Sequence, residues 1–553
     1  MQIHYSKILL QIICFSFFVL FIAGCSSSKD HFGFETSRSL SANAITHEQI
    51  EINANRTLNN LFAEEAHIGE DITLSSAMAR ALLYNLEDRI SRMEYAMATK
   101  QVAINKFDLL PQLAFNAGYT SRDSHNVSLS ENLKTRRIST QQSTTSDRSI
   151  INSSLGAVWN VLDFSRAYVN SKIQTNEVLS LAQRKRQAMI NIMNQVRYLF
   201  FQAWAAQEMQ DEINEMIIDI QQILQNAENV EKSGNLAPER ILNLQAQYLV
   251  TFQDLLEMHR TLSTAKFKLA TFINLPPGKA FNLIMDEDDM TLPQSFELKG
   301  YALNKLEQKA LMNRPEILMS EYNVRIKANE IHDTILKMLP SVSMDITQNW
   351  TSNSYTVNDS YLSLGIAASY NLLDLIRMSS ELKNAKARKA IEEKRQMAFS
   401  ISAIAALHIS LSNYNLTYQE YHYAAKLADV RKRLLKEKIA GVATNTSSKS
   451  ELFQARLESL KEEMYQLVLY AELNNALNQI YTSVGIDTAP KSITYDLKAM
   501  SKIIKQKLAV IKDPKALLTF QNDYTYDNLL FKEALEYMPL LLISKNQRNS
   551  SLL

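Results

Sequence analysis

Glycine and proline are scarce in this 553-residue chain, with 11 and 10 residues respectively. Each makes up about 2% of the chain, far below the usual shares of roughly 7% for glycine and 5% for proline. Few positions therefore favour a turn or break a helix. Long uninterrupted helices or strands are therefore expected. Cysteine is scarcer still, with Cys14 and Cys25 only, which excludes a disulfide-rich scaffold.

The chain also has no excess of charge, because 59 basic and 58 acidic residues give a net charge of +1. Binding to nucleic-acid phosphates needs a basic excess or stripe, so no nucleic-acid partner is expected. The motifs GxSxG, P-loop and HExxH do not occur in the sequence. We therefore expect no enzyme activity, no metal site and no cofactor.

Beyond the N-terminus, no run of about 18 or more apolar residues predicts a membrane-spanning helix. Only helices and closed barrels satisfy every backbone hydrogen-bonding group in lipid. If the mature chain crosses a membrane, it therefore does so as strands of a closed barrel. The 46% share of hydrophobic residues is enough for a large core.

The N-terminus predicts a lipoprotein signal peptide over residues 1–24. Lys7 precedes the apolar stretch ILLQIICFSFFVLFIAG, and Ile22-Ala23-Gly24-Cys25 resembles a bacterial lipobox. Cys25 would become the first residue of the mature chain and carry acyl chains such as palmitate, and residues 25–73 would form a periplasmic segment. Cys14 would leave with the signal, so no mature thiol would remain. The alternative is an uncleaved membrane helix, for which the run is short.

Four segments alternate apolar and polar residues, as strands with two different faces do. They come in two pairs, at about 111–120 with 151–162 and at about 341–350 with 361–372. Each is about 9 to 12 residues long, which is the length that a tilted transmembrane strand needs. A soluble antiparallel sheet with one wet face is the alternative for these pairs.

A very long helix is predicted after each strand pair, over about 163–233 and 374–440. Neither segment contains a glycine or proline until its end. In the first, apolar residues follow alternating steps of three and four, which indicates side-by-side coiled packing. Its seam is Val196, Leu199, Ala203, Ala206, Gln210, Ile213, Ile217, Ile220, Leu224 and Ala227. The second has a less regular seam of Leu407, Leu411, Tyr414, Tyr418, Tyr421, Ala425 and Ala428.

One sequence motif occurs twice, each time where a strand pair meets its long helix. Its two copies are WNVLDFSR from Trp159 and YNLLDLIR from Tyr370. The shared polar positions are 211 residues apart: Asn160, Asp163, Arg166, Asn371, Asp374 and Arg377. We expect the two aspartates to be helix N-caps, and the arginines to reach the same carboxylate or a neighbouring chain. Internal duplication follows, with repeats at 74–278 and 279–485. The extension at 486–553 has no assigned role.

The ordered motifs resemble TolC-type outer-membrane factors, especially their lipoprotein branch, over about residues 74–485. They are NRPEI from Asn313, Leu-Pro before a strand, NxLD before a long helix, and SGNLAPERILNLQAQ from Ser233. The resemblance implies a mainly α fold with a small β part, assembled as a homotrimer. Three copies would form a 12-stranded transmembrane barrel in the outer membrane of a Gram-negative bacterium, and an α-helical tunnel would continue it into the periplasm. Four strands cannot close alone, since small barrels need about eight.

The same resemblance implies a function. The chain would be the outer-membrane channel of a tripartite efflux or type I secretion system, a passive duct. A periplasmic adaptor and an inner-membrane pump would be its partners, and drugs, metals or proteins its cargo. The alternative is a lipid-anchored periplasmic scaffold or adaptor without a pore.

Two helical hairpin tips lie at the ends of the long helices and are expected to form a closed gate. Gly234 and Gly441 are expected to end these helices, and polar residues crowd both tips. The candidates are Glu239, Arg240, Lys449 and Glu451. Inter-chain ion pairs in such a ring could hold it shut until a partner binds. Ordinary solvated turn residues are the alternative.

Overall fold

The computed structural model describes residues 47–60, 71–233, 238–276, 278–286, 301–486, 496–511 and 516–519. The chain forms two compact units. In the first, Met1–Glu64, the described element is helix α2 (His47–Asn60). The second, Glu65–Leu553, contains every element discussed below.

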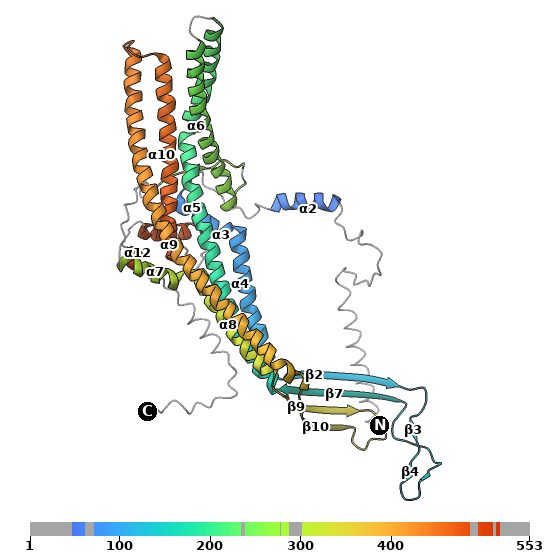
Figure 1. The fold of residues 1–553 in the computed structure, drawn as a ribbon. Coiled ribbons are helices and arrows are strands. Elements are labelled where there is room, and N and C mark those ends of the chain that lie inside the picture. Colours follow the sequence, from blue (N-terminus) through green and yellow to red (C-terminus); the bar gives the residue numbers. More distant parts are fainter. Residues whose placement is uncertain are drawn as a thin grey trace. The chain divides into compact units, whose positions relative to one another are not determined.

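One four-stranded antiparallel sheet lies at an end of the long helices (Figure 1). Its strands are β2 (Gln112–Ser121), β7 (Ser149–Asn160), β9 (Ser341–Thr351) and β10 (Ser360–Ser369). The order β10-β9-β7-β2 joins the two strand pairs through β7 and β9. The loop between β2 and β7 holds two short ladders, formed by β3 (Val127–Ser128), β4 (Glu131–Asn132), β5 (Arg137–Ile138) and β6 (Ser143–Thr144).

The register gives the sheet one apolar and one polar face. Leu113, Ala157, Ile346 and Leu364 are successive partners in one row across the strands. Side chains alternate between faces along a strand, so the next row belongs to the other face. The apolar face also exposes Phe115, Tyr119, Ile151, Leu155, Trp159, Met344, Trp350, Leu362 and Ile366. A contiguous exposed apolar face of this kind marks a surface for lipid or for a protein partner.

Two long helices follow the strand pairs: α5 (Val161–Ser233) and α9 (Leu372–Ala443), with 73 and 72 residues. At 1.5 Å per residue, each has a contour length of about 110 Å. Return helices α6 (Pro238–Phe272) and α10 (Lys449–Ser483) pack against them. The helices that enter the strand pairs are α4 (Leu86–Asn105), with the short η1 (Lys106–Leu109), and α8 (Pro315–Lys337).

The predicted seams are largely buried. In α5, Val196, Ala203 and Ile213 are fully inaccessible, whereas Gln210 is exposed. In α9, Leu407 and Tyr414 are fully buried in a core cluster with α10. The aromatic residues of this second seam therefore fill a helix interface.

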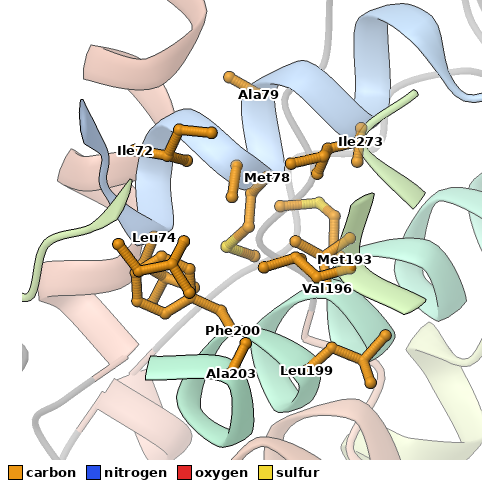
Figure 2. Close-up of a cluster of buried hydrophobic side chains, with 14 of the residues drawn as sticks. Ile72, Leu74, Met78, Ala79, Met193, Val196, Leu199, Phe200, Ala203 and Ile273 are labelled. Carbon is orange, nitrogen blue, oxygen red and sulfur yellow. The ribbon is translucent and has the colours of Figure 1, made fainter. Parts of the chain in front are cut away.

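A core cluster beside the middle of α5 joins segments far apart in sequence (Figure 2). It includes residues of β1 (Asp71–Ile72), α3 (Leu74–Tyr84), α5, the end of α6, β8 (Asn282–Leu283) and α11 (Leu497–Ile511). Met500, Ile504 and Leu508 are the contribution of α11. Part of the 486–553 extension is therefore built into this core.

A second C-terminal segment, α12 (Ala516–Thr519), packs against α7 (Tyr301–Asn313). Lys309 Nζ donates to the carbonyl oxygens of Leu517 and Leu518, at 3.1 and 2.8 Å. This lysine thereby satisfies carbonyl groups that a helix end leaves unpaired.

The first turn of α4 contains a fully buried carboxyl group, Asp88. Arg92 forms an ion pair with it at 3.0 Å and also donates to the Leu82 carbonyl at 2.9 Å. Burial raises the pKa of Asp88 from 3.8 to about 6, although the charges of Arg92 and Lys185 oppose the shift. The folded chain therefore holds this proton more tightly than the unfolded chain does.

We expect Asp88 to make the folded state less stable as the pH rises from about 4 to about 6. Over this range the unfolded chain ionises first, and the loss is on the order of 2 kcal/mol. Asp88→Asn should remove this part of the pH dependence, because an amide does not titrate. Denaturant unfolding at both ends of the range measures it. An unchanged difference between the two pH values in the variant would contradict the assignment.

Candidate functional site

The junction between strand and helix is capped by asparagine in both copies, so the expectation of aspartate N-caps was wrong. Asn371 is the N-cap of α9, and its side chain accepts from the Leu373 N–H at 3.2 Å. Asn160 accepts from the N–H groups of Leu162 and Asp163, at 2.9 and 3.3 Å. Asparagine can cap the helix because its side-chain oxygen accepts from the same free backbone N–H groups that an aspartate would.

The aspartates and arginines of the repeated motif differ between the copies. Arg377 pairs with Asp374 in the first turn of α9. Arg166 instead donates to Asp333 of α8 at 3.1 Å, and Lys337 contacts the same carboxylate at 2.6 Å. In the first copy the arginine of the repeated motif therefore joins α5 to α8. In the second copy the pair stays within the first turn of α9.

Gly441 does not end α9, contrary to expectation. The helix continues to Ala443, and the residue with positive φ is Asn445 at 57°. Gly441 is needed because the tip folds back onto it. The N–H groups of Thr446 and Ser447 bond its carbonyl oxygen at 2.8 and 3.1 Å, and a Cβ at this position would overlap Ser447 Oγ.

The tip candidates are exposed, and one of them is paired. Glu451 accepts from Lys438 Nζ at 2.6 Å, and this bond and charge lower the pKa of the carboxyl. Both residues belong to the α9–α10 hairpin, so their ion pair does not connect the two hairpins. Glu239, Arg240 and Lys449 are exposed at the starts of α6 and α10. Gly234 lies outside the described residues.

The ion pairs between the hairpins involve residues that the sequence patterns did not indicate. Arg456 of α10 reaches Glu215 and Asp219 of α5, at 2.7 and 2.8 Å. Lys461 of α10 reaches Asp254 of α6 at 2.7 Å. All these side chains are partly exposed, and single charges on long helices usually face solvent, so only the packing identifies them.

Nearer the tip, the two hairpins are also joined by a buried aromatic contact. The Tyr248 ring of α6 packs edge-on against Phe453 of α10, with centroids 5.2 Å apart. Its hydroxyl lies 2.7 Å from Ser450 Oγ. The described parts of the two hairpins are therefore held together within one chain by apolar, hydrogen-bonded and ionic contacts.

Both the sheet and the helices form open rows with two free edges. The strand row has β2 and β10 at its edges, and contacts between neighbouring helices give the row α4, α5, α8, α9. The edge helix α4 exposes a heptad-spaced apolar stripe of Leu86, Ile90, Met93, Met97 and Ile104. Such a stripe is the surface that a coiled-coil partner covers.

The opposite edge helix, α9, is also unusually exposed. Among the described residues it is the one helix with an 18-residue window long and apolar enough to cross a membrane, by length and composition alone. That window has a mean hydropathy of 1.2, and 22% of it is buried. Ile409, Leu416, Tyr423 and Val430 are exposed at steps of seven, which is also the spacing of a coiled-coil surface. Cys25, the predicted lipidation site, lies outside the described residues.

Comparison with known proteins gives one family and one fold. Residues 79–275 match the family described as Outer membrane efflux protein. The fold is similar to that of the MtrE outer membrane channel of Neisseria gonorrhoeae, with a TM-score of 0.57 and 17% identity, covering 75% of this chain and 89% of that one. No curated protein matches the chain in sequence.

Two further solved structures have the same fold. CusC, described by its transmembrane channel formation, gives a TM-score of 0.57 at 16% identity, covering 77% of this chain and 96% of its own. The CmeC outer membrane channel of Campylobacter jejuni gives 0.56 at 13% identity, covering 88% and 95%. At these identities the likeness establishes the fold alone.

Proposed function

The chain carries an outer membrane efflux protein domain at residues 79–275, and from this premise we propose that three copies form a passive efflux duct through the outer membrane of a Gram-negative bacterium. The observation that carries the proposal is the open sheet. Three successive antiparallel pairings separate β10 from β2, so the two edge strands run in opposite directions. The β10 edge of one copy can therefore pair antiparallel with the β2 edge of the next.

Closure of this kind would remove the energetic cost of the free strand edges and of the exposed apolar face. Free edge strands expose unpaired N–H and C=O groups, which lipid cannot satisfy. A closed 12-stranded barrel would leave no edge, and its apolar face would contact lipid while the polar face lined a water-filled lumen. The helix row would close in the same order, with α9 of one copy beside α4 of the next.

The partners are part of the same proposal. An inner-membrane pump, joined through a periplasmic adaptor, would supply the energy, because no nucleotide-binding motif occurs in this chain. The hairpin ends of α5–α6 and α9–α10, with Glu239, Arg240, Gly441, Lys449 and Glu451, would form the gate at the periplasmic end. Gly234 belongs to the same proposed tip.

Reconstitution tests the proposal directly. Detergent-extracted protein should migrate as an oligomer that heat converts to the monomer, and it should produce discrete conductance steps in planar bilayers. A monomer that detaches from membranes when the lipid is removed would instead support a periplasmic scaffold without a pore.

Lipid attachment is proposed at Cys25. Cys25→Ser should abolish incorporation of labelled palmitate, because a hydroxyl does not replace the thiol that carries the lipid. The oligomer should still assemble, since the barrel itself would hold the protein in the membrane. Labelled lipid on the serine variant would disprove attachment at this residue.

A further inference from the structure

One residue on the four strands carries a charge. Asp345, near the middle of β9, is the only Asp, Glu, Lys, Arg or His in β2, β7, β9 and β10. It lies on the polar face, in a row with Gln112, Val158 and Gly365. The rest of this face consists mostly of neutral side chains, among them Asn116, Ser154, Thr347, Asn349 and Ser363.

The Asp345 carboxylate has no structural partner. Within the described chain it makes no ion pair and no hydrogen bond, whereas Asp333 and Asp219, at contacts between helices, are both paired. It lies over the backbone of Gly365, where a Cβ would overlap its Oδ1 atom. Glycine at this position leaves room for the carboxylate on the polar face. In the proposed barrel this ionisable group would face the water-filled lumen, where an unpaired carboxylate acts on passing solutes.

We propose that Asp345 makes the lumen of the barrel select cations over anions, an inference that rests on the proposed trimeric duct. Three copies would place three carboxylates at one level of the wall, with no opposing charge on the strands. A ring of carboxylates attracts cations and repels anions in a water-filled pore. The favoured solutes would be inorganic cations and cationic organic molecules.

The competing source of selectivity is the loop between β2 and β7. It carries Arg122, Lys134, Arg136, Arg137 and Arg148 against Asp123, Glu131 and Asp147. This basic excess at the mouth would favour anions, which is the opposite sign. The channel's preference for cations or anions, and the effect of a substitution at Asp345 on that preference, therefore distinguish the Asp345 ring from the loop as the source of selectivity.

Reversal potentials in a KCl gradient across a planar bilayer test the inference. The wild-type channel should prefer K⁺, and Asp345→Asn should lower the K⁺/Cl⁻ permeability ratio at least about threefold, because the ring loses all its charge. Asp345→Glu should keep the preference. Asp359→Asn is the matched control: it removes the same charge from the exposed β9–β10 loop and should leave the ratio unchanged.

Asp345→Cys in a Cys14→Ser, Cys25→Ser background gives a second test within one protein. Modification of the new thiol by an anionic methanethiosulfonate should restore the K⁺ preference, and a cationic reagent should reverse it. Channels that conduct with the same ratio in every variant would overturn the role of Asp345 and leave the duct intact. An assembled wild-type oligomer that does not conduct would instead overturn the duct itself.

Discussion

Met93→Glu combined with Met97→Glu is expected to abolish the proposed trimer and leave the fold of the single chain intact. Both methionines belong to the exposed stripe of α4, where they are 70% and 68% exposed. Burial of a methionine contributes about 1.5–3 kcal/mol, and an unpaired carboxylate in the same seam costs more than that. Threefold assembly would repeat the penalty at three interfaces.

Met93→Leu with Met97→Leu is the matched control. Leucine keeps the volume and the apolar character of the seam, so this variant should assemble like the wild type. Heat-modifiable migration and light scattering in detergent measure the oligomer, and circular dichroism measures the helix content. An oligomer that tolerates the two glutamates would show that this stripe faces solvent or another partner.

Strand and helix positions follow from the sequence because they depend on local patterns. The alternation around Phe115 and Leu364 predicts which residues share a face, and the register places both on the apolar face of one sheet. The absence of glycine and proline from α5 predicts its length. Patterns of this kind depend on residues that are close together in the sequence, so a single sequence is sufficient to identify them.

Side-chain partners were less predictable, because they depend on packing between distant segments. Arg166 was expected to reach the nearby Asp163 or a neighbouring chain, yet it bonds Asp333 of its own chain, which is 167 residues away. The N-cap is Asn371 rather than Asp374, because the helix begins two residues earlier than the pattern suggested. The role of α11 in the core could not be inferred either, since its partners on α3 precede it by more than 400 residues.

In the candidate gate, too, the positions of residues follow from the sequence whereas their side-chain partners do not. Tip residues such as Glu451 can be found from the hairpin pattern, but the sequence does not reveal that this carboxylate is paired with Lys438 inside its own hairpin. The ion pairs that join the two hairpins lie further from the tip, at Arg456 and Lys461. A single arginine in a charged helix carries no local signal of that role.

Arg456→Ala is expected to open the proposed duct. It removes two ion pairs between α10 and α5 in each chain, and exposed pairs contribute about 0.2–1 kcal/mol each. Three chains that open together would lose about 1–6 kcal/mol of closed-state stability, and about 1.4 kcal/mol already changes an equilibrium tenfold. Single-channel recordings should therefore show a higher conductance or an open probability raised at least about fivefold.

Two companion variants locate the gate. Arg433→Ala removes an ion pair with Asp429 within α9, which joins no two helices, and should leave the conductance unchanged. The triple variant Glu239→Ala, Arg240→Ala and Glu451→Ala should raise the conductance less than Arg456→Ala does, because Glu451 bonds only its own hairpin. If Arg456→Ala conducts like the wild type while the triple variant opens, the closure lies at the tip and the ion pairs to Glu215 and Asp219 merely stabilise the fold.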